Sequence, residues 1–217
     1  AFRDRYDFPL DTFQVQACEA LDEGRDVLVA APTGSGKTVV GEYAIHLARE
    51  TGRKAFYTTP IKALSNQKYR DLVAQYGETD VGLLTGDVSI NGHAQTVVMT
   101  TEVLRNMVYE SSPDLTGLGY VVLDEVHYLA DRERGAVWEE LIIQLPESVA
   151  IAALSATVSN VEEFGAWMAT VRGDTQIVLE EHRPVPLWQQ VMANNRLFDL
   201  FVDDAQRQVN PELQRLA

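Results

Sequence analysis

Short apolar segments rich in β-branched residues alternate with longer segments of helical character along most of this chain. Strands that are buried on both faces are apolar throughout, and a helix between two strands allows them to lie parallel. The pattern therefore predicts an α/β fold with a mainly parallel β-sheet and helices on both faces. We expect strands at residues 27–31, 54–59, 81–84, 96–100, 120–123, 150–154 and 176–179, and helices at 37–50, 62–76, 102–109, 136–144 and 161–170.

The alternation ends near residue 180, and the next segment reads HRPVPL. Its two prolines favour an extended backbone over a helix. We expect residues 1–181 to form one domain. Residues 182–217 are expected to be a connector followed by a partly helical tail without a clear core of its own.

The charge of the chain is unevenly distributed. Acidic residues outnumber basic ones by 32 to 18, which gives a net charge of −14 and argues against a simple nucleic-acid binder with a basic footprint. Residues 51–70 nevertheless contain five basic residues and no acidic one. Taken alone, this segment is best interpreted as a solvated helix face, and plain solvation is the interpretation we prefer for Arg53 and Arg70.

The sequence also bears on the cellular setting. Cys18 is the one cysteine and cannot form an internal disulfide, so a reducing cytoplasm is the simplest setting. No apolar run approaches the roughly 18 residues that a membrane-spanning helix requires. The opening residues are charged and lack the apolar stretch of a signal peptide, so we expect no export signal there.

A glycine-rich loop lies between the first expected strand and its helix, where the sequence reads APTGSGKT. Backbone N–H groups in such a loop and at the helix N-terminus attract phosphate. Lys37 is expected to reach the β- and γ-phosphates and the Thr38 hydroxyl to ligate Mg²⁺. Ala31 stands where this pattern usually has glycine, and the alternative is a plain turn before a helix. The expected nucleotide contacts are Ala31, Pro32, Thr33, Gly34, Ser35, Gly36, Lys37 and Thr38.

An acidic pair ends the strand expected at residues 120–123, where the sequence reads LDEVH. Asp124 is suited to hold Mg²⁺, and Glu125 is placed to orient or deprotonate an attacking water. Acidic pairs are common in surface loops, so the prediction for this acidic pair depends on the phosphate loop that precedes it in the sequence. His127 is ambiguous between a core or surface residue and one that relays the state of the nucleotide.

Taken together, the motifs resemble those of the superfamily-two helicases, and the DEVH box resembles that of the DExH group. Within that group the resemblance is to the Ski-like RNA helicases, in particular to their actinobacterial HelY-type branch. The resemblance covers residues 8 to about 190. Besides the phosphate loop and the DEVH box, it rests on FPLDTFQVQA (8–17), TTPIKALSNQK (58–68), LLTGDVSIN (83–91), MTTEVLRNM (99–107), ADRERGAVWEE (130–140), LSAT (154–157) and HRPVPL (182–187).

The resemblance implies a RecA-like P-loop NTPase domain with ATP and Mg²⁺ as its cofactors. By this resemblance Gln14 would read the adenine edge. Ser155 and Thr157, together with His127, would couple the state of the nucleotide to the binding of a nucleic-acid strand. A Ser or Thr after a β-strand is otherwise commonly a helix cap. Asp87 and Glu102 are acidic and would orient their neighbours or cap helices rather than contact phosphate. The implied contacts to nucleic-acid phosphates are Thr59, Pro60, Lys62, Asn66, Gln67, Thr85, Gly86 and Thr101.

The function implied by the resemblance is ATP-dependent 3′-to-5′ translocation on single-stranded RNA. The motifs of the family's second RecA-like domain are not found in the sequence, so that domain and its arginine are expected to be partners from the same full-length chain, and the isolated domain is expected to be nearly inactive. The alternatives are a DNA repair helicase, an ATP-gated binding module without turnover, and a P-loop kinase. Trp138 is expected in the core or at a domain interface.

Overall fold

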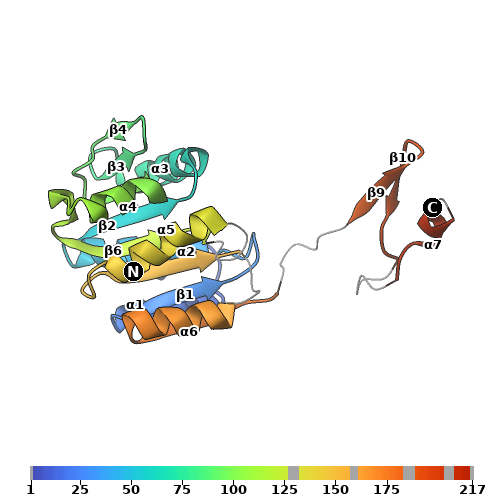
Figure 1. The fold of residues 1–217 in the computed structure, drawn as a ribbon, viewed down its shortest axis with the longest axis horizontal. Helices are drawn as coiled ribbons and strands as arrows, with labels where there is room; N and C mark the ends of the chain where they lie inside the picture. Colours follow the sequence, from blue (N-terminus) through green and yellow to red (C-terminus); the bar gives the residue numbers. More distant parts are fainter. Residues whose placement is uncertain (1, 127–131, 157–160, 183–188, 203–207, 216–217) are drawn as a thin grey trace. The chain divides into compact units, whose positions relative to one another are not determined.

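The computed structural model describes residues 2–126, 132–156, 161–182, 189–202 and 208–215. The chain divides into two compact units, Ala1–His182 and Arg183–Ala217 (Figure 1). The first unit holds the phosphate loop and the acidic pair, and each unit is described by itself below.

An eight-stranded sheet forms the centre of the first unit within the described residues, in the order β4-β3-β5-β2-β6-β7-β1-β8. All neighbouring strands pair in parallel except β3 and β4, which are antiparallel. The predicted α/β fold with a mainly parallel sheet is therefore confirmed. The strands are β1 (Asp26–Ala30), β2 (Lys54–Thr59), β3 (Val81–Leu84), β4 (Ser89–Ile90), β5 (Thr96–Thr100), β6 (Leu118–Leu123), β7 (Ala150–Ser155) and β8 (Thr175–Leu179).

Helices cover both faces of this sheet (Figure 1). They are η1 (Phe2–Arg5), α1 (Thr12–Asp22), α2 (Thr38–Glu50), α3 (Lys62–Tyr76), α4 (Thr101–Tyr109), η2 (Pro113–Leu115), α5 (Arg132–Gln144) and α6 (Val161–Arg172).

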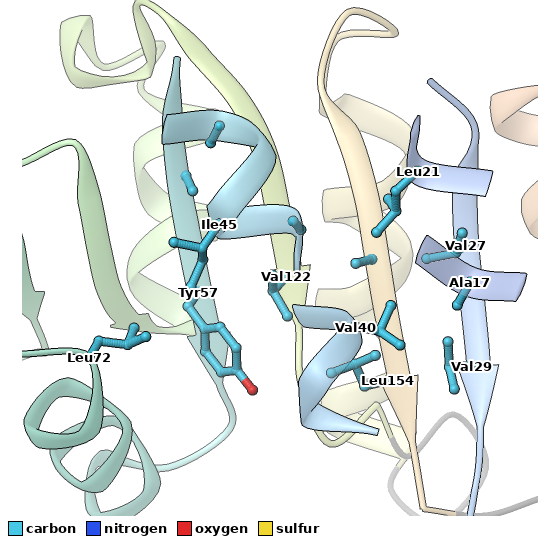
Figure 2. Close-up of a cluster of buried hydrophobic side chains, with 14 of the residues drawn as sticks. Ala17, Leu21, Val27, Val29, Val40, Ile45, Tyr57, Leu72, Val122 and Leu154 are labelled. Atoms are coloured by element: carbon cyan, nitrogen blue, oxygen red, sulfur yellow. The ribbon is translucent and has the colours of Figure 1, made fainter. Parts of the chain in front are cut away.

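The alternation of side chains along the strands divides the core into two layers. On one face, Val27 and Val29 of β1 pack with residues of α1, α2 and α3, and Figure 2 shows part of this cluster around Ile45 and Tyr57. On the other face, Leu28 packs with residues of α4, α5 and α6, including Trp138, whose core placement confirms the prediction. Every central strand is thus buried on both sides, which explains the continuous apolar runs.

The predicted strands and helices all occur, with small shifts at their ends. The bounds of β2, β3, β5 and α3 agree with the prediction, whereas α5 begins earlier than the apolar pattern indicated. Helix α1 and the short strand β4 are additional to the predicted elements. Helix α1 begins after Asp11, whose backbone N–H and side chain form a capping box with Gln14.

The second unit contains a β-hairpin where a partly helical tail was expected. Strands β9 (Gln190–Ala193) and β10 (Arg196–Asp199) pair antiparallel across Asn194 and Asn195. Both asparagines have positive φ, at 47° and 59°, as a tight two-residue hairpin turn requires. The helix described there, α7 (Pro211–Gln214), has four residues. The expected extended connector HRPVPL is residues 182–187, and residues 183–187 lie outside the described residues.

None of the described helices has the length and apolar character needed to span a membrane.

A buried ion pair joins three elements at the end of the sheet away from the phosphate loop. Arg172, at the end of α6, places Nε 2.9 Å from Oδ2 of Asp26 at the start of β1, and the two side chains are 3% and 8% exposed. The other carboxylate oxygen of Asp26 accepts from the Ile151 N–H at 2.7 Å. The guanidinium also donates to the backbone carbonyls of Leu145 and Val149. The pair therefore fixes β1 relative to α6 and β7.

Replacing Arg172 with methionine is expected to lower the free energy of unfolding by about 3–5 kcal/mol, because the Asp26 carboxylate would remain buried without its partner. The matched control is Arg105→Met, which breaks the exposed pair with Glu140 and should cost no more than about 1 kcal/mol. Urea unfolding of the two variants measures the difference. Equal losses would show that the buried pair is not an anchor.

Candidate functional site

The site lies where four neighbouring parallel strands reach their carboxyl ends. In the order β2-β6-β7-β1, these strands end at Thr59, Leu123, Ser155 and Ala30. Backbone hydrogen bonds continue beyond the strands, from the Ala31 N–H to the Ser155 carbonyl and from the Val126 N–H to the Leu154 carbonyl. This is the edge at which open parallel sheets bind ligands.

The glycine-rich loop has the geometry of a phosphate cradle. Gly34 and Gly36 have φ values of 85° and 81°, which L side chains rarely adopt. Ser35 lies between them, and its hydroxyl oxygen is buried without a hydrogen bond in the described part of the chain. Lys37 follows and directly precedes α2, with only 5% of its surface exposed. A buried hydroxyl and a buried ammonium at a helix N-terminus fit an anionic ligand.

Gln14 connects α1 to this loop. Its Oε1 accepts from the Asp11 N–H at 2.9 Å, and its Nε2 donates to the Gly36 carbonyl at 3.0 Å. A Cβ at position 36 would lie 2.7 Å from that Nε2, so the contact itself requires glycine there. The Gln14 side-chain amide, which the resemblance implies reads adenine, therefore binds the backbone of the phosphate loop in this structure. Thr33 and Gly34 are exposed, whereas Ala31 and Pro32 are buried.

The acidic pair faces the loop. Glu125 places Oε1 3.5 Å from Nζ of Lys37, and its φ of 55° is an unfavourable value for a residue with a side chain. Such local strain is concentrated at functional sites. Asp124 is 7% exposed, and one of its carboxylate oxygens accepts from the Glu125 N–H at 2.9 Å.

Tyr57 of β2 donates its phenolic O–H to the other Asp124 oxygen at 2.6 Å. Burial raises the pKa of Asp124, and the Tyr57 hydrogen bond partly opposes that rise. Burial also raises the pKa of Tyr57 well above its ordinary value, so the phenol remains a donor. Sequence reasoning missed Tyr57, although a tyrosine in an otherwise apolar buried strand must find a partner for its hydroxyl.

Thr38, Asp124 and Glu125 line one hollow of about 380 Å³. Hydroxyl and carboxylate oxygens are the ligands that Mg²⁺ prefers, so this donor set fits a magnesium ion that also binds phosphate. The hollow extends onto α3 and α2, and its other lining residues are Glu42, Thr59, Leu64, Gln67, Lys68 and Asp71.

The residues implied to contact nucleic acid fall into two groups. Thr59 and Thr101 are buried, and their hydroxyls donate to the carbonyls of Ile61 and Thr59, respectively. The other implied contacts reach the surface to different degrees. Lys62, Asn66, Gln67 and Gly86 are exposed, and Pro60 and Thr85 are half-buried.

Asp87 ties two of these segments together. Its Oδ1 lies 2.7 Å from Nζ of Lys62 and accepts from the Thr85 hydroxyl at 3.0 Å. These contacts lower the pKa of the Asp87 carboxyl. This is the geometry expected of a carboxylate that orients its neighbours.

The interpretation of Arg53 as a solvated residue was wrong. Its guanidinium donates to the backbone carbonyls of Leu118 and Ser148, and its stem packs against Gly119. Among the residues implied to couple nucleotide state to strand grip, Ser155 is buried at the end of β7 beside the Asp124 strand. His127 and Thr157 lie outside the described residues.

Comparison with known proteins gives a family match and several relatives. Residues 11–164 match the family model of DEAD/DEAH box helicases. The chain is 64% identical over 213 residues to the probable helicase HelY of Mycobacterium tuberculosis H37Rv. This alignment covers 96% of this chain and 24% of that protein. It is 47% identical over 191 residues to the antiviral helicase SKI2 of Saccharomyces cerevisiae, with coverage of 88% and 15%. The chain thus spans about a quarter or less of the length of these relatives.

Solved structures support the fold. A hypothetical ATP-dependent RNA helicase from Sulfolobus tokodaii aligns with a TM-score of 0.62 at 22% identity over 82% of this chain and 55% of that chain. The helicase MrfA bound to DNA aligns with a TM-score of 0.64 at 21% identity, with coverage of 79% and 27%. At these identities the likeness concerns the fold, which is RecA-like. Because the family model matches well over half of the chain, the chain belongs to the DEAD/DEAH box helicase family.

Proposed function

We propose that this chain is the ATP-binding domain of an ATP-dependent helicase or translocase that moves along single-stranded RNA. The observation that carries the proposal is the meeting of Lys37 and Glu125 at 3.5 Å, beside the hollow shared by Thr38 and Asp124. A cation for phosphate, two oxygens for Mg²⁺ and a carboxylate for water are the parts that phosphoryl transfer from ATP requires. RNA as the strand is supported by the relatives, which include DExH RNA helicases.

The residues of the chain would divide the work of hydrolysis among them. Gly34 and Gly36 let the backbone surround the phosphates, and a bound phosphate would attract the Lys37 ammonium. The Glu125 carboxylate would orient a water for in-line attack. Thr38 and Asp124 would hold Mg²⁺, which when bound neutralises charge that develops on the phosphates.

The RNA strand would lie along the exposed side of α3 and the loop after β3. Lys62, Asn66, Gln67 and Gly86 offer an ammonium, amides and backbone N–H groups, which grip phosphates without reading bases. The 3′-to-5′ direction is proposed from the family resemblance. We also propose a second RecA-like domain that supplies an arginine to the γ-phosphate. The cytoplasm is proposed as the setting, in keeping with the buried Cys18, whose thiol pKa is raised by burial to about 12.

Glu125→Gln in the complete protein is expected to lower kcat for ATP hydrolysis by about 10²-fold or more, because the amide cannot act as a base toward water. The Kd for Mg-ATP should change little, and equilibrium binding alongside steady-state ATPase assays separates the two effects. Glu78→Gln, a change at an exposed acid outside the site, is the control. Near-normal turnover of the Glu125 variant would exclude this residue as the one that positions water.

The chain by itself is expected to bind Mg-ATP yet hydrolyse it about 10³–10⁵-fold more slowly than the complete protein, because an arginine from outside contributes that much. Single-turnover hydrolysis by residues 1–217 and by the complete protein provides the comparison. Comparable rates would mean that the active site is complete within this chain.

RNA is expected to stimulate the ATPase of the complete protein more strongly than DNA of matched sequence and length. Contacts to phosphates alone do not distinguish the sugars, so the test must be made directly. Stronger stimulation by DNA would support a DNA repair helicase. The lack of turnover at saturating RNA would instead support an ATP-gated binding module.

A further inference from the structure

A half-buried ion pair joins the helix proposed to grip the strand to the helix that follows the phosphate loop. Lys68 of α3 places Nζ 3.1 Å from Oε1 of Glu42 in α2, and the side chains are 12% and 21% exposed. Both residues line the hollow that holds Thr38 and Asp124. A pair this sheltered from water is screened less than a surface pair, and it connects α3 directly to α2.

The same ammonium lies against Tyr57. The Lys68 Nζ is 5.1 Å from the centroid of the Tyr57 ring, within the range of a cation–π contact. Tyr57 is fully buried between the two helices, and its hydroxyl donates to Oδ2 of Asp124 at 2.6 Å. Figure 2 shows the ring beside Ile45, with its hydroxyl oxygen at the outer end of the side chain. One aromatic side chain thus contacts both the cation of α3 and the proposed magnesium ligand.

Glu42 also reaches a third segment. Its second oxygen, Oε2, accepts from the Tyr6 hydroxyl at 2.7 Å. The Tyr6 ring lies 5.4 Å from that of Phe8, which begins the segment that resembles the adenine-binding motif. The carboxylate of Glu42 is therefore shared between α3 and the residues that precede α1.

Helix α3 is well placed to transmit a displacement. The Thr59 and Ser65 hydroxyl oxygens are 2.7 Å apart, which fixes the start of the helix to the end of β2. Asn66 and Gln67, two of the proposed strand contacts, directly precede Lys68 in the same helix. A strand bound on the exposed side of α3 would therefore act on the backbone that also carries the Lys68 ammonium.

We propose that Lys68 is a positioning residue that, through Glu42 and Tyr57, couples strand binding on α3 to the position of the Asp124 carboxylate. The inference rests on the proposed function, since it assumes that α3 contacts RNA and that Asp124 holds Mg²⁺. Coupling between two sites is reciprocal: bound RNA tightens Mg-ATP binding by the same factor by which Mg-ATP tightens RNA binding.

The test uses the complete protein and measures the Kd of a fluorescent ATP analogue in the presence of Mg²⁺, with and without a single-stranded RNA oligonucleotide. The ratio of the two Kd values is the coupling factor, for which roughly 5–150-fold is typical. Lys68→Met is expected to bring this factor close to one, while the Kd for RNA without nucleotide changes little. Glu42→Gln should have the same effect, and the double variant should lose no more than either single variant.

Arg70→Met is the matched control, because it removes the same charge from the same helix at an exposed position. Lys68→Arg keeps the positive charge and should retain part of the coupling that Lys68→Met loses. A purely structural role of Lys68 in folding does not predict that difference between the two variants. Tyr57→Phe should raise the Mg²⁺ concentration needed for nucleotide binding, with little effect on binding in EDTA. Circular dichroism and thermal unfolding confirm that each variant folds.

The outcomes separate this inference from the proposed function. If Lys68→Met and Glu42→Gln keep the coupling factor of Arg70→Met, the positioning role is wrong. If the unaltered protein binds Mg-ATP and RNA with no coupling, the inference fails while the ATP site stands. If the unaltered protein does not bind Mg-ATP at all, the proposed function itself fails.

Discussion

The parallel register of β6, β7 and β1 is the constraint on which the rest of the site depends. It brings the ends of two strands that are distant in the sequence to one edge, with Ser155 between the phosphate loop and the acidic pair. The backbone bonds from Ala31 to Ser155 and from Val126 to Leu154 extend that register into the loops themselves. The Lys37–Glu125 distance is therefore a property of the sheet. At the opposite edge, the buried Asp26–Arg172 pair holds β1 in place.

Motifs that act through their own backbone could be predicted from the sequence. The phosphate loop needs only a strand, glycines with positive φ and a helix start, all of which are local. The apolar strands were equally clear because both of their faces are buried. Contacts between distant residues were not predictable in this way: nothing near Tyr57 in the sequence indicates Asp124, and nothing near Gln14 indicates Gly36.

The errors have the same physical origin. The expectation of a partly helical tail is met by the four-residue helix α7 but omitted the β-hairpin, whose turn is formed by two asparagines with positive φ. That turn depends on the backbone conformation of two residues alone. The interpretation of Arg53 as a solvated residue was wrong for the same reason. Its carbonyl partners lie in Leu118 and Ser148, far along the chain, and become neighbours only when β2 pairs with β6.

The basic segment 51–70 bears on how an acidic chain could hold a nucleic-acid strand in the proposed function. Within the described residues, its cations are used largely on the protein itself: Arg53 and Lys54 bind backbone carbonyls, Lys62 binds Asp87 and Lys68 binds Glu42. In the proposed function a nucleic-acid strand would therefore be held mainly by amides and backbone N–H groups, so counterion release would contribute little and the affinity would depend weakly on salt. Weak electrostatic grip would suit the proposed translocating motor, because each step requires release, and the sheltered Glu42–Lys68 pair would then serve the proposed coupling of the two sites.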